Sequence, residues 1–299
     1  MKTFTLFLAG AGVIGLGGLG AEKSARADFF SFSTGDPDGL IATASRPASA
    51  GKIETESADD FVLTQQTQLF SASFTGLVTS AGTGSISFPR VTVDIYRVFP
   101  NESDATRTIT VPTRVNSPGD VELTGADTAE GNMTFTTTTL SPTFTATNSV
   151  LNGIHPSPDQ TTGGEGPVTG EEVRFDVTFT PPIDLAPDHY FFRPEVEVAN
   201  GEFFWLSSAK PIVPPGNAFA PDLQSWTRNE TILPDWIRIG TDVVGGETPP
   251  TFNASFSLVG QTAAQAVPLP PAAWSGLATI AIAGLVNSKR LIARRVRRE

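Results

Sequence analysis

The chain has 299 residues and a formal net charge of −11, and it contains no cysteine and two histidines. The missing cysteines exclude a disulfide scaffold, a thiol nucleophile and a thiolate metal site. Glycine (28), proline (24) and phenylalanine (21) are frequent, whereas charged residues make up only 17%. Because helical bundles are rich in charged helix formers, this composition favours many short strands joined by turns.

The N-terminal segment, residues 1–27, predicts a secretory signal peptide. Lys2 precedes an apolar, glycine-rich run over 4–19, and Ala25 and Ala27 form a small-x-small cleavage site for signal peptidase. A permanent anchor helix is the alternative, but the four glycines within 12–18 weaken such a helix. We therefore expect the exported chain to begin at Asp28.

The body, residues 28–262, predicts an all-β domain. Its lead-in, 28–57, lacks a regular pattern and carries a turn signal at 36–39. Apolar and polar residues then alternate over 69–78, 91–99 and 173–179, as in half-buried strands. We expect Pro181 and Pro182 to end the last of these strands, and we expect 101–129 and 152–170 to be loops.

The second half of the body contains the strongest turn signal. Asn200 and Gly201 separate two strand-like runs, 190–199 and 202–208, and this dipeptide predicts a hairpin because both residues tolerate positive φ. Short strands are expected at 223–228, 236–239 and 252–258. Antiparallel strands that bury one face must pack as two sheets, so the leading architecture is a jelly-roll-like antiparallel β-sandwich. An incomplete barrel is the second choice.

The C-terminal segment, residues 263–299, has three successive parts: a proline-rich stretch, an apolar run over 272–286 and a basic tip. As a transmembrane helix the run would cover about 22 Å, which is short of a hydrocarbon core of about 30 Å. The basic residues after the run predict a cytoplasmic tip and an external body. These basic residues are Lys289, Arg290, Arg294, Arg295, Arg297 and Arg298.

This tail resembles the PEP-CTERM sorting signal of exported Gram-negative proteins, in its Val-Pro-Leu-Pro-Ala variant. The motif residues are Val267, Pro268, Leu269, Pro270 and Pro271, the last of which replaces the variant's alanine. The resemblance implies recognition by an exosortase in the inner membrane and cleavage near the motif. It further implies delivery to the cell surface or the extracellular polysaccharide matrix. An ordinary single-pass anchor is the alternative. The body also resembles the β-rich bodies of other PEP-CTERM proteins.

The body is strongly acidic, with 29 acidic residues against 11 basic ones once both end segments are removed. Such a surface repels phosphate backbones, so nucleic-acid binding is disfavoured. The charge is compatible with simple solubility or with divalent cations. A Ca²⁺ site is one hypothesis, because carboxylates at short spacing suit this ion and the lead-in could fold back beside the first strand. Its ligands would be Asp36, Asp38, Asp59 and Asp60.

Two further features bear on function. Sugars bind on exposed aromatic faces, so the aromatic-rich hairpin suggests glycan contacts at Tyr190, Trp205, Trp226 and Trp236, with core packing as the alternative. Paired carboxylates could cleave glycosides, but Glu195 and Glu197 alternate with valines and are expected to face solvent. His155 and His189 are expected to be turn or edge residues rather than metal ligands.

These observations predict an exported surface or extracellular-matrix protein with a non-catalytic structural or adhesive β-sandwich and no required cofactor. The alternative is a carbohydrate-binding module for extracellular polysaccharide, and a secreted glycan-active enzyme is the third reading. The expected partners are signal peptidase, the exosortase, the inner membrane during export, and extracellular polysaccharide.

Overall fold

The computed structural model describes residues 27–49, 51–82, 84–154, 160–212 and 222–263. One compact unit spans Ala27–Ala263. The expected signal peptide up to Arg26, His155 and the sorting segment from residue 264 onward lie outside the described residues. Within the described ranges, no helix is long and apolar enough to span a membrane, and the transmembrane helix expected over 272–286 lies outside them.

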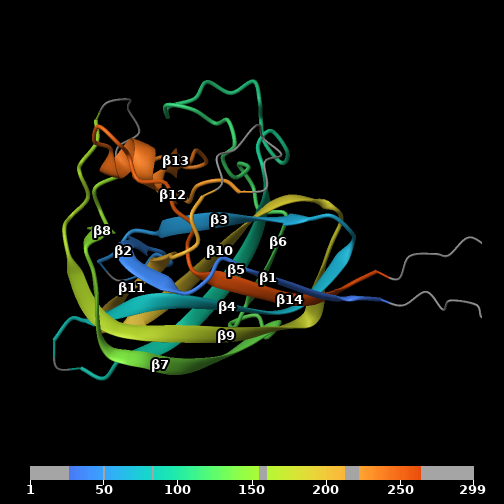
Figure 1. Ribbon diagram of the computed structural model, residues 1–299, viewed down its shortest axis with the longest axis horizontal. Coiled ribbons are helices and arrows are strands. Elements are labelled where there is room, and N and C mark those ends of the chain that lie inside the picture. The colour runs from blue at the N-terminus through green and yellow to red at the C-terminus, as the bar shows by residue number, and fades with distance from the viewer. Residues whose placement is uncertain (1–26, 50, 83, 155–159, 213–221, 264–299) are drawn as a thin grey trace, which may run out of the picture. The chain divides into compact units, whose positions relative to one another are not determined.

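The described residues confirm an all-β fold with two sheets (Figure 1). In the larger sheet the main path runs β1-β14-β4-β11-β2-β8, and β9 joins β4 to β7. Its strands are β1 (Phe29–Ser33), β2 (Pro37–Ala44), β4 (Thr67–Ser80), β7 (Met133–Ala146), β8 (Asn148–Val150), β9 (Val168–Leu185), β11 (Gly201–Ser208) and β14 (Phe256–Thr262).

The smaller sheet has the order β13-β12-β3-β10-β5-β6. Its strands are β3 (Thr55–Leu63), β5 (Ser87–Arg97), β6 (Thr124–Asp127), β10 (Asp188–Ala199), β12 (Trp226–Asn229) and β13 (Ile237–Arg238). The pairs between the described strands are antiparallel except β2 with β8, which is parallel. The expectation of a purely antiparallel fold is therefore wrong at this one edge.

Aromatic side chains from both sheets form the main core. Phe192 of β10 stacks on Phe256 of β14 with ring centroids 5.0 Å apart, and Phe74 of β4 stacks on Phe175 of β9 at 5.2 Å. Each such ring is fully buried, and burying one stabilises the fold by about 2 kcal/mol. The alternating apolar residues of the sequence therefore face one another between the two sheets.

A second layer covers the outer face of the smaller sheet. Tyr96, Phe191, Trp226 and Trp236 cluster there, away from the main core. The short strand expected over 236–239 is present as β13, and a six-residue π-helix, η1 (Ile239–Val244), follows it directly. The apolar residues Ile239 and Val243 of η1 pack in a third cluster. The outer face of this sheet is thus largely buried, although antiparallel sheets often leave one face to solvent.

The lead-in expected to be irregular holds two strands, β1 and β2, as well as the start of β3. These strands gain their order from pairing with distant segments: β1 pairs with β14, and β2 pairs with β11. Likewise, β6 lies inside the expected loop 101–129 because it pairs with β5. Local sequence patterns carry no information about such long-range pairing.

Strand β9 continues beyond Pro181 and Pro182, contrary to expectation. Its pairing with β4 is irregular at this point: Thr178 lies opposite Ser71, and pairing resumes with Ile183 opposite Leu69. The two prolines occupy the interruption, where no ladder hydrogen bond is required of them.

The expected hairpin at Asn200 and Gly201 is also wrong. The turn exists, with Asn200 at φ 62°, but β10 and β11 belong to different sheets. The backbone N–H of Ala81 donates to the Asn200 carbonyl at 2.7 Å, so the turn closes against the end of β4. A Cβ on Gly201 would lie 2.0 Å from the Thr79 carbonyl oxygen, which explains the glycine.

Candidate functional site

The aromatic residues proposed to contact glycan are buried. Tyr190, Trp205, Trp226 and Trp236 each expose at most 1% of their surface. The indole N–H of Trp205 donates to the Ser255 carbonyl at 2.9 Å, and the Tyr190 hydroxyl donates to the Ala186 carbonyl at 2.9 Å. These side chains offer no face for a sugar, so the expected glycan contacts are wrong and core packing accounts for these residues.

The four aspartates proposed to bind Ca²⁺ do not form a shared site. The Asp38 carboxylate accepts from the Leu40 N–H at 2.9 Å, and Asp59 accepts from Ser225 Oγ at 2.8 Å and Ala254 N at 2.9 Å. Asp36 is exposed. Within the described residues, no group of three or more histidines, aspartates or glutamates could hold a metal ion. Asp38 and Asp59 act instead as hydrogen-bond acceptors within the protein.

His189 and Asp60 form a buried pair, although His189 was expected at a turn or an edge. Its Nε2 lies 2.6 Å from Asp60 Oδ2, and both side chains expose 2% or less. Burial raises the pKa of the Asp60 carboxyl, and the His189 contact acts in the opposite direction. Asp60 also accepts from the Leu223 N–H at 2.7 Å. This pair therefore fastens β3 to β10 and to the segment beginning at Asp222.

A carboxylate pocket of about 270 Å³ lies on the outer face of the smaller sheet, beside β5, β6 and β10. Six carboxylates and two guanidinium groups line it, so the pocket has an excess of negative charge when its carboxyls are ionised. Its lining residues are Pro47, Glu54, Arg90, Thr92, Asp94, Glu122, Gly125, Ala126, Asp127, Glu130, Arg193 and Glu195.

Arg193 is the central cation of this carboxylate pocket. Its Nη2 pairs with Asp94 Oδ2 and its Nη1 pairs with Glu195 Oε2. Behind it, Nε lies 3.2 Å from Glu56 Oε2, and Glu56 is also bound by Arg228. The register explains this meeting, because Arg193 lies opposite Asp94 and Glu195 lies opposite Thr92 on the same face of the sheet.

The expectation that Glu195 faces solvent is wrong, because this side chain exposes only 4% of its surface. Its Oε2 accepts from Thr92 Oγ1 at 3.2 Å, whereas its Oε1 has no hydrogen-bond partner among the described residues. An unpartnered buried carboxylate oxygen carries a desolvation cost of about 1–3 kcal/mol. A proton or a cationic ligand would offset that cost.

Both pocket carboxyls on Arg193 resist ionisation. Burial raises the pKa of Asp94 to about 7; Arg193 opposes the shift, while Glu122 and Glu56 add to it. Burial also raises the pKa of Glu195 to about 8, again against Arg193 and with help from Glu56 and Glu54. Such perturbed carboxyls in a cavity are typical of binding and catalytic sites.

Gly125 shapes the floor of the carboxylate pocket. It lies opposite Asp94 in the β5–β6 ladder, and a Cβ added there would lie 2.0 Å from Asp94 Oδ1. The missing side chain therefore lets the Asp94 carboxylate extend over β6 towards Glu122. Only a residue without a Cβ allows this carboxylate position.

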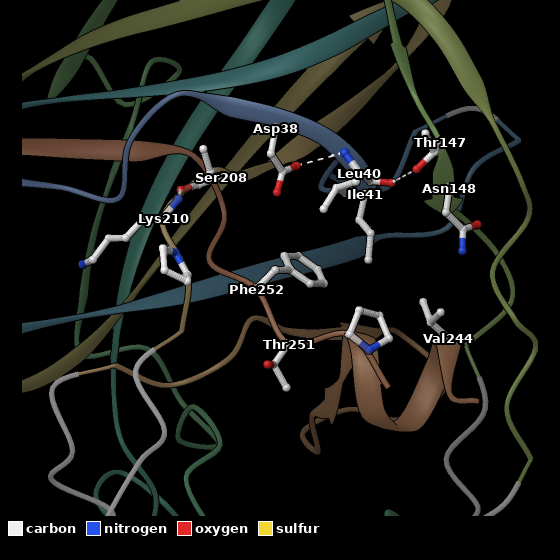
Figure 2. Close-up of a pocket in the computed structure, with 13 residues that line it drawn as sticks. Asp38, Leu40, Ile41, Thr147, Asn148, Ser208, Lys210, Val244, Thr251 and Phe252 are labelled. Atoms are coloured by element: carbon white, nitrogen blue, oxygen red, sulfur yellow. Dashed lines mark hydrogen bonds between the residues drawn. The ribbon is translucent and has the colours of Figure 1, made fainter. Parts of the chain in front are cut away.

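A second hollow, the edge groove, has a volume of about 470 Å³ and lies beside β2 and β8 (Figure 2). Figure 2 shows Ile41 and Phe252 pointing towards each other across it. The lining mixes apolar residues with six polar ones, Asp38, Thr147, Asn148, Ser208, Lys210 and Thr251. The groove is large enough for a small ligand, whereas the carboxylate pocket suits a small polar one.

Comparisons with protein-family models, with curated proteins and with solved structures found no match to this chain. The functional interpretation therefore depends on the residues themselves. Sequence reasoning missed Asp94 and Arg193 as site residues. A usable signal existed: each is a charged residue within a strand whose neighbours are apolar, as in 93–95 and 190–198.

Proposed function

We propose that this chain is an exported protein, processed by an exosortase, whose jelly-roll-like β-sandwich acts without catalysis at the cell surface or in the extracellular matrix. The arrangement of its two ends supports this proposal best. Strand β1 begins at Phe29, next to the expected cleavage site, and β14 ends at Thr262, just before the sorting segment. A single β-domain therefore occupies the residues between the expected signal peptide and the expected sorting segment.

The two ends also pair with each other. Phe29 lies opposite Gln261, and the Thr262 N–H donates to the Asp28 carbonyl at 2.9 Å. The first and last strands of the body therefore lie together at the β1–β14 edge of the larger sheet, while β8 and the edge groove lie at its other edge.

Mass spectrometry of the exported protein tests this proposal. We expect a Gram-negative host with an exosortase to produce a form that begins at Asp28 and lacks the basic tip, and a host without the exosortase to retain that tip. Substituting Pro268→Ala with Pro270→Ala should also retain it. The matched control is Pro181→Ala with Pro182→Ala, two exposed prolines of β9. An identical C-terminus in both hosts would overturn the proposal.

A second candidate function is carbohydrate binding in the edge groove, favoured by its volume and its mixed lining rather than by the buried tryptophans. Polysaccharide from the host would bind over the exposed Leu40 and Thr251 at the groove, with hydroxyl groups against the polar side chains. We expect Lys210→Ala to weaken that binding. Lys52→Ala is the control, because Lys52 pairs with Glu202 away from the groove. Equal binding by both variants would remove this candidate.

A further inference from the structure

The carboxylate pocket has an excess of negative charge in a confined space. The ion pairs of Arg193 and Arg228 involve three carboxylates, Glu56, Asp94 and Glu195, so two cations face three anions. Glu54 and Glu122 add further negative charge from the pocket wall. Arg90 brings one more cation, but it pairs with Asp127 at 2.9 Å through its Nε. With all carboxyls ionised, Arg193 and Arg228 therefore face five carboxylates, so three negative charges are left without a cation; the five are Glu54, Glu56, Asp94, Glu122 and Glu195.

The unpartnered oxygen lies in the same pocket. Glu195 lines the pocket, is buried, and leaves its Oε1 without a partner among the described residues. Arg193 pairs with Glu195 through Oε2, and its Nε and Nη1 face Glu56 and Glu195 without forming a hydrogen bond of their own. The Oε1 atom of the ionised Glu195 therefore remains open to a donor from a ligand.

The size and shape of the pocket limit what that donor is. A divalent metal requires several oxygens at 2.0–2.6 Å from one point, and no three carboxylates of the described residues converge in that way. A volume of about 270 Å³ instead accommodates a small organic molecule. A primary ammonium group carries one positive charge and three N–H donors, which matches carboxylates that are spread around a cavity.

We propose that the carboxylate pocket binds a small organic ligand through a primary ammonium group, with Glu195 and Asp94 as the main acceptors. Glu122 and Glu54 contribute negative charge at the wall, and Gly125 provides the space that keeps the Asp94 carboxylate in place. The site does not depend on the proposed export route or on the edge groove.

Binding at this pocket would be linked to protons. Because the pKa values of Asp94 and Glu195 are raised to about 7 and about 8, Asp94 is partly protonated and Glu195 is mostly protonated near pH 7. The groups that face these carboxyls are Glu54 and Glu56 of the β3 side, Arg193 of β10, Arg90 of β5, and Glu122 and Asp127 beside β6. A bound ammonium ion favours the ionised carboxylates and displaces their protons, so its affinity should increase from pH 6 to pH 8.5.

Isothermal titration calorimetry of the full chain in detergent micelles tests the proposal. The probes are 1,4-diaminobutane, butanol as a neutral molecule of similar size, and tetramethylammonium as a cation without N–H donors. We expect saturable binding of the diamine at pH 8.5, at least about tenfold weaker binding of tetramethylammonium, and no binding of butanol. Calcium chloride is the fourth probe. Tighter binding of Ca²⁺ than of the diamine, or no binding of the diamine at either pH, would overturn the proposal.

Two substitutions locate the binding site. Glu195→Gln should weaken diamine binding about tenfold or more and remove most of its pH dependence. Glu197→Gln is the matched control, because Glu197 lies two residues along the same strand and does not line the pocket. Glu122→Gln is a second test. Glu122 lines the pocket at an exposed position, so this substitution should leave the fold intact. Unchanged affinity in both Glu195→Gln and Glu122→Gln would place the ligand elsewhere and refute the assignment.

Discussion

Glu56 of β3 and Arg228 of β12 form a two-point ion pair across neighbouring strands, from Nε to Oε1 at 2.8 Å and from Nη2 to Oε2 at 2.9 Å. The Arg228 guanidinium also lies 4.2 Å from the centre of the Trp236 ring and donates to the Tyr96 hydroxyl at 2.9 Å. Because Glu56 also faces Arg193, this pair connects the buried aromatic cluster to the carboxylate pocket.

Removing one partner of the Glu56–Arg228 pair should lower the free energy of unfolding. Glu56→Gln leaves Arg228 and Arg193 with less compensating charge in a buried position, and breaking a buried ion pair costs about 3–5 kcal/mol. We expect a loss of about 3 kcal/mol in the free energy of unfolding, measured by urea denaturation. Glu202→Gln is the comparison, since its pairs with Arg46 and Lys52 are more exposed. Equal losses in both variants would show that burial of the Glu56 pair adds nothing.

The free energy of unfolding should depend on pH through Asp94 and Glu195. Their folded pKa values, about 7 and about 8, lie above the ordinary values of 3.8 and 4.5. Between about pH 4 and about pH 8 the folded protein therefore binds more protons than the unfolded chain, so stability falls as pH rises. Each group contributes a slope of at most about 1.4 kcal/mol per pH unit. Urea denaturation across this range measures the slope, which should be shallower in Glu195→Gln and unchanged in Glu197→Gln.

Gly125→Ala should disturb the carboxylate pocket without changing any charge. The new Cβ would lie 2.0 Å from Asp94 Oδ1, so the carboxylate must move. Overpacking of this kind costs about 1–3 kcal/mol. Gly153→Ala serves as the control, because its nearest contact would be Thr162 Cγ2 at 3.3 Å. Thermal unfolding of the two variants gives the comparison, and a neutral Gly125→Ala would show that Asp94 can relocate freely.

Asp59→Ala should destabilise the fold although Asp59 was proposed as a Ca²⁺ ligand. The substitution leaves Ser225 Oγ and the Ala254 N–H without their buried acceptor, and an unsatisfied buried donor costs about 1–3 kcal/mol. Asp36→Ala, at an exposed position, should change stability by less than about 0.5 kcal/mol. Chemical denaturation with and without Ca²⁺ distinguishes the two roles, because a structural acceptor predicts no dependence on the ion.

Much of the strand content follows from the amino-acid sequence. Alternation over 91–99 and 173–179 predicted half-buried strands, because the two-residue period of a strand is a local property. Strand β9 includes all of 173–179, and β5 covers the predicted range up to Arg97. The sequence of the two ends likewise supports the proposed export and sorting, since such signals are read as linear segments. Asn200 and Gly201 predicted a turn for the same reason, and the structure has one there.

Which strands pair with each other could be learned only from the tertiary structure. No local sequence pattern indicates that β10 and β11 lie in different sheets or that β1 pairs with β14, at the other end of the body's sequence. The carboxylate pocket depends on the same long-range register, which places Asp94 opposite Arg193 and Gly125 opposite Asp94. Burial in the folded protein also determines what these side chains can do. Trp205 and Trp226 pack in the core, and Glu195 is a buried carboxylate in the carboxylate pocket. Solvent exposure and charge compensation are properties of the folded arrangement, because they depend on which distant segments cover each side chain.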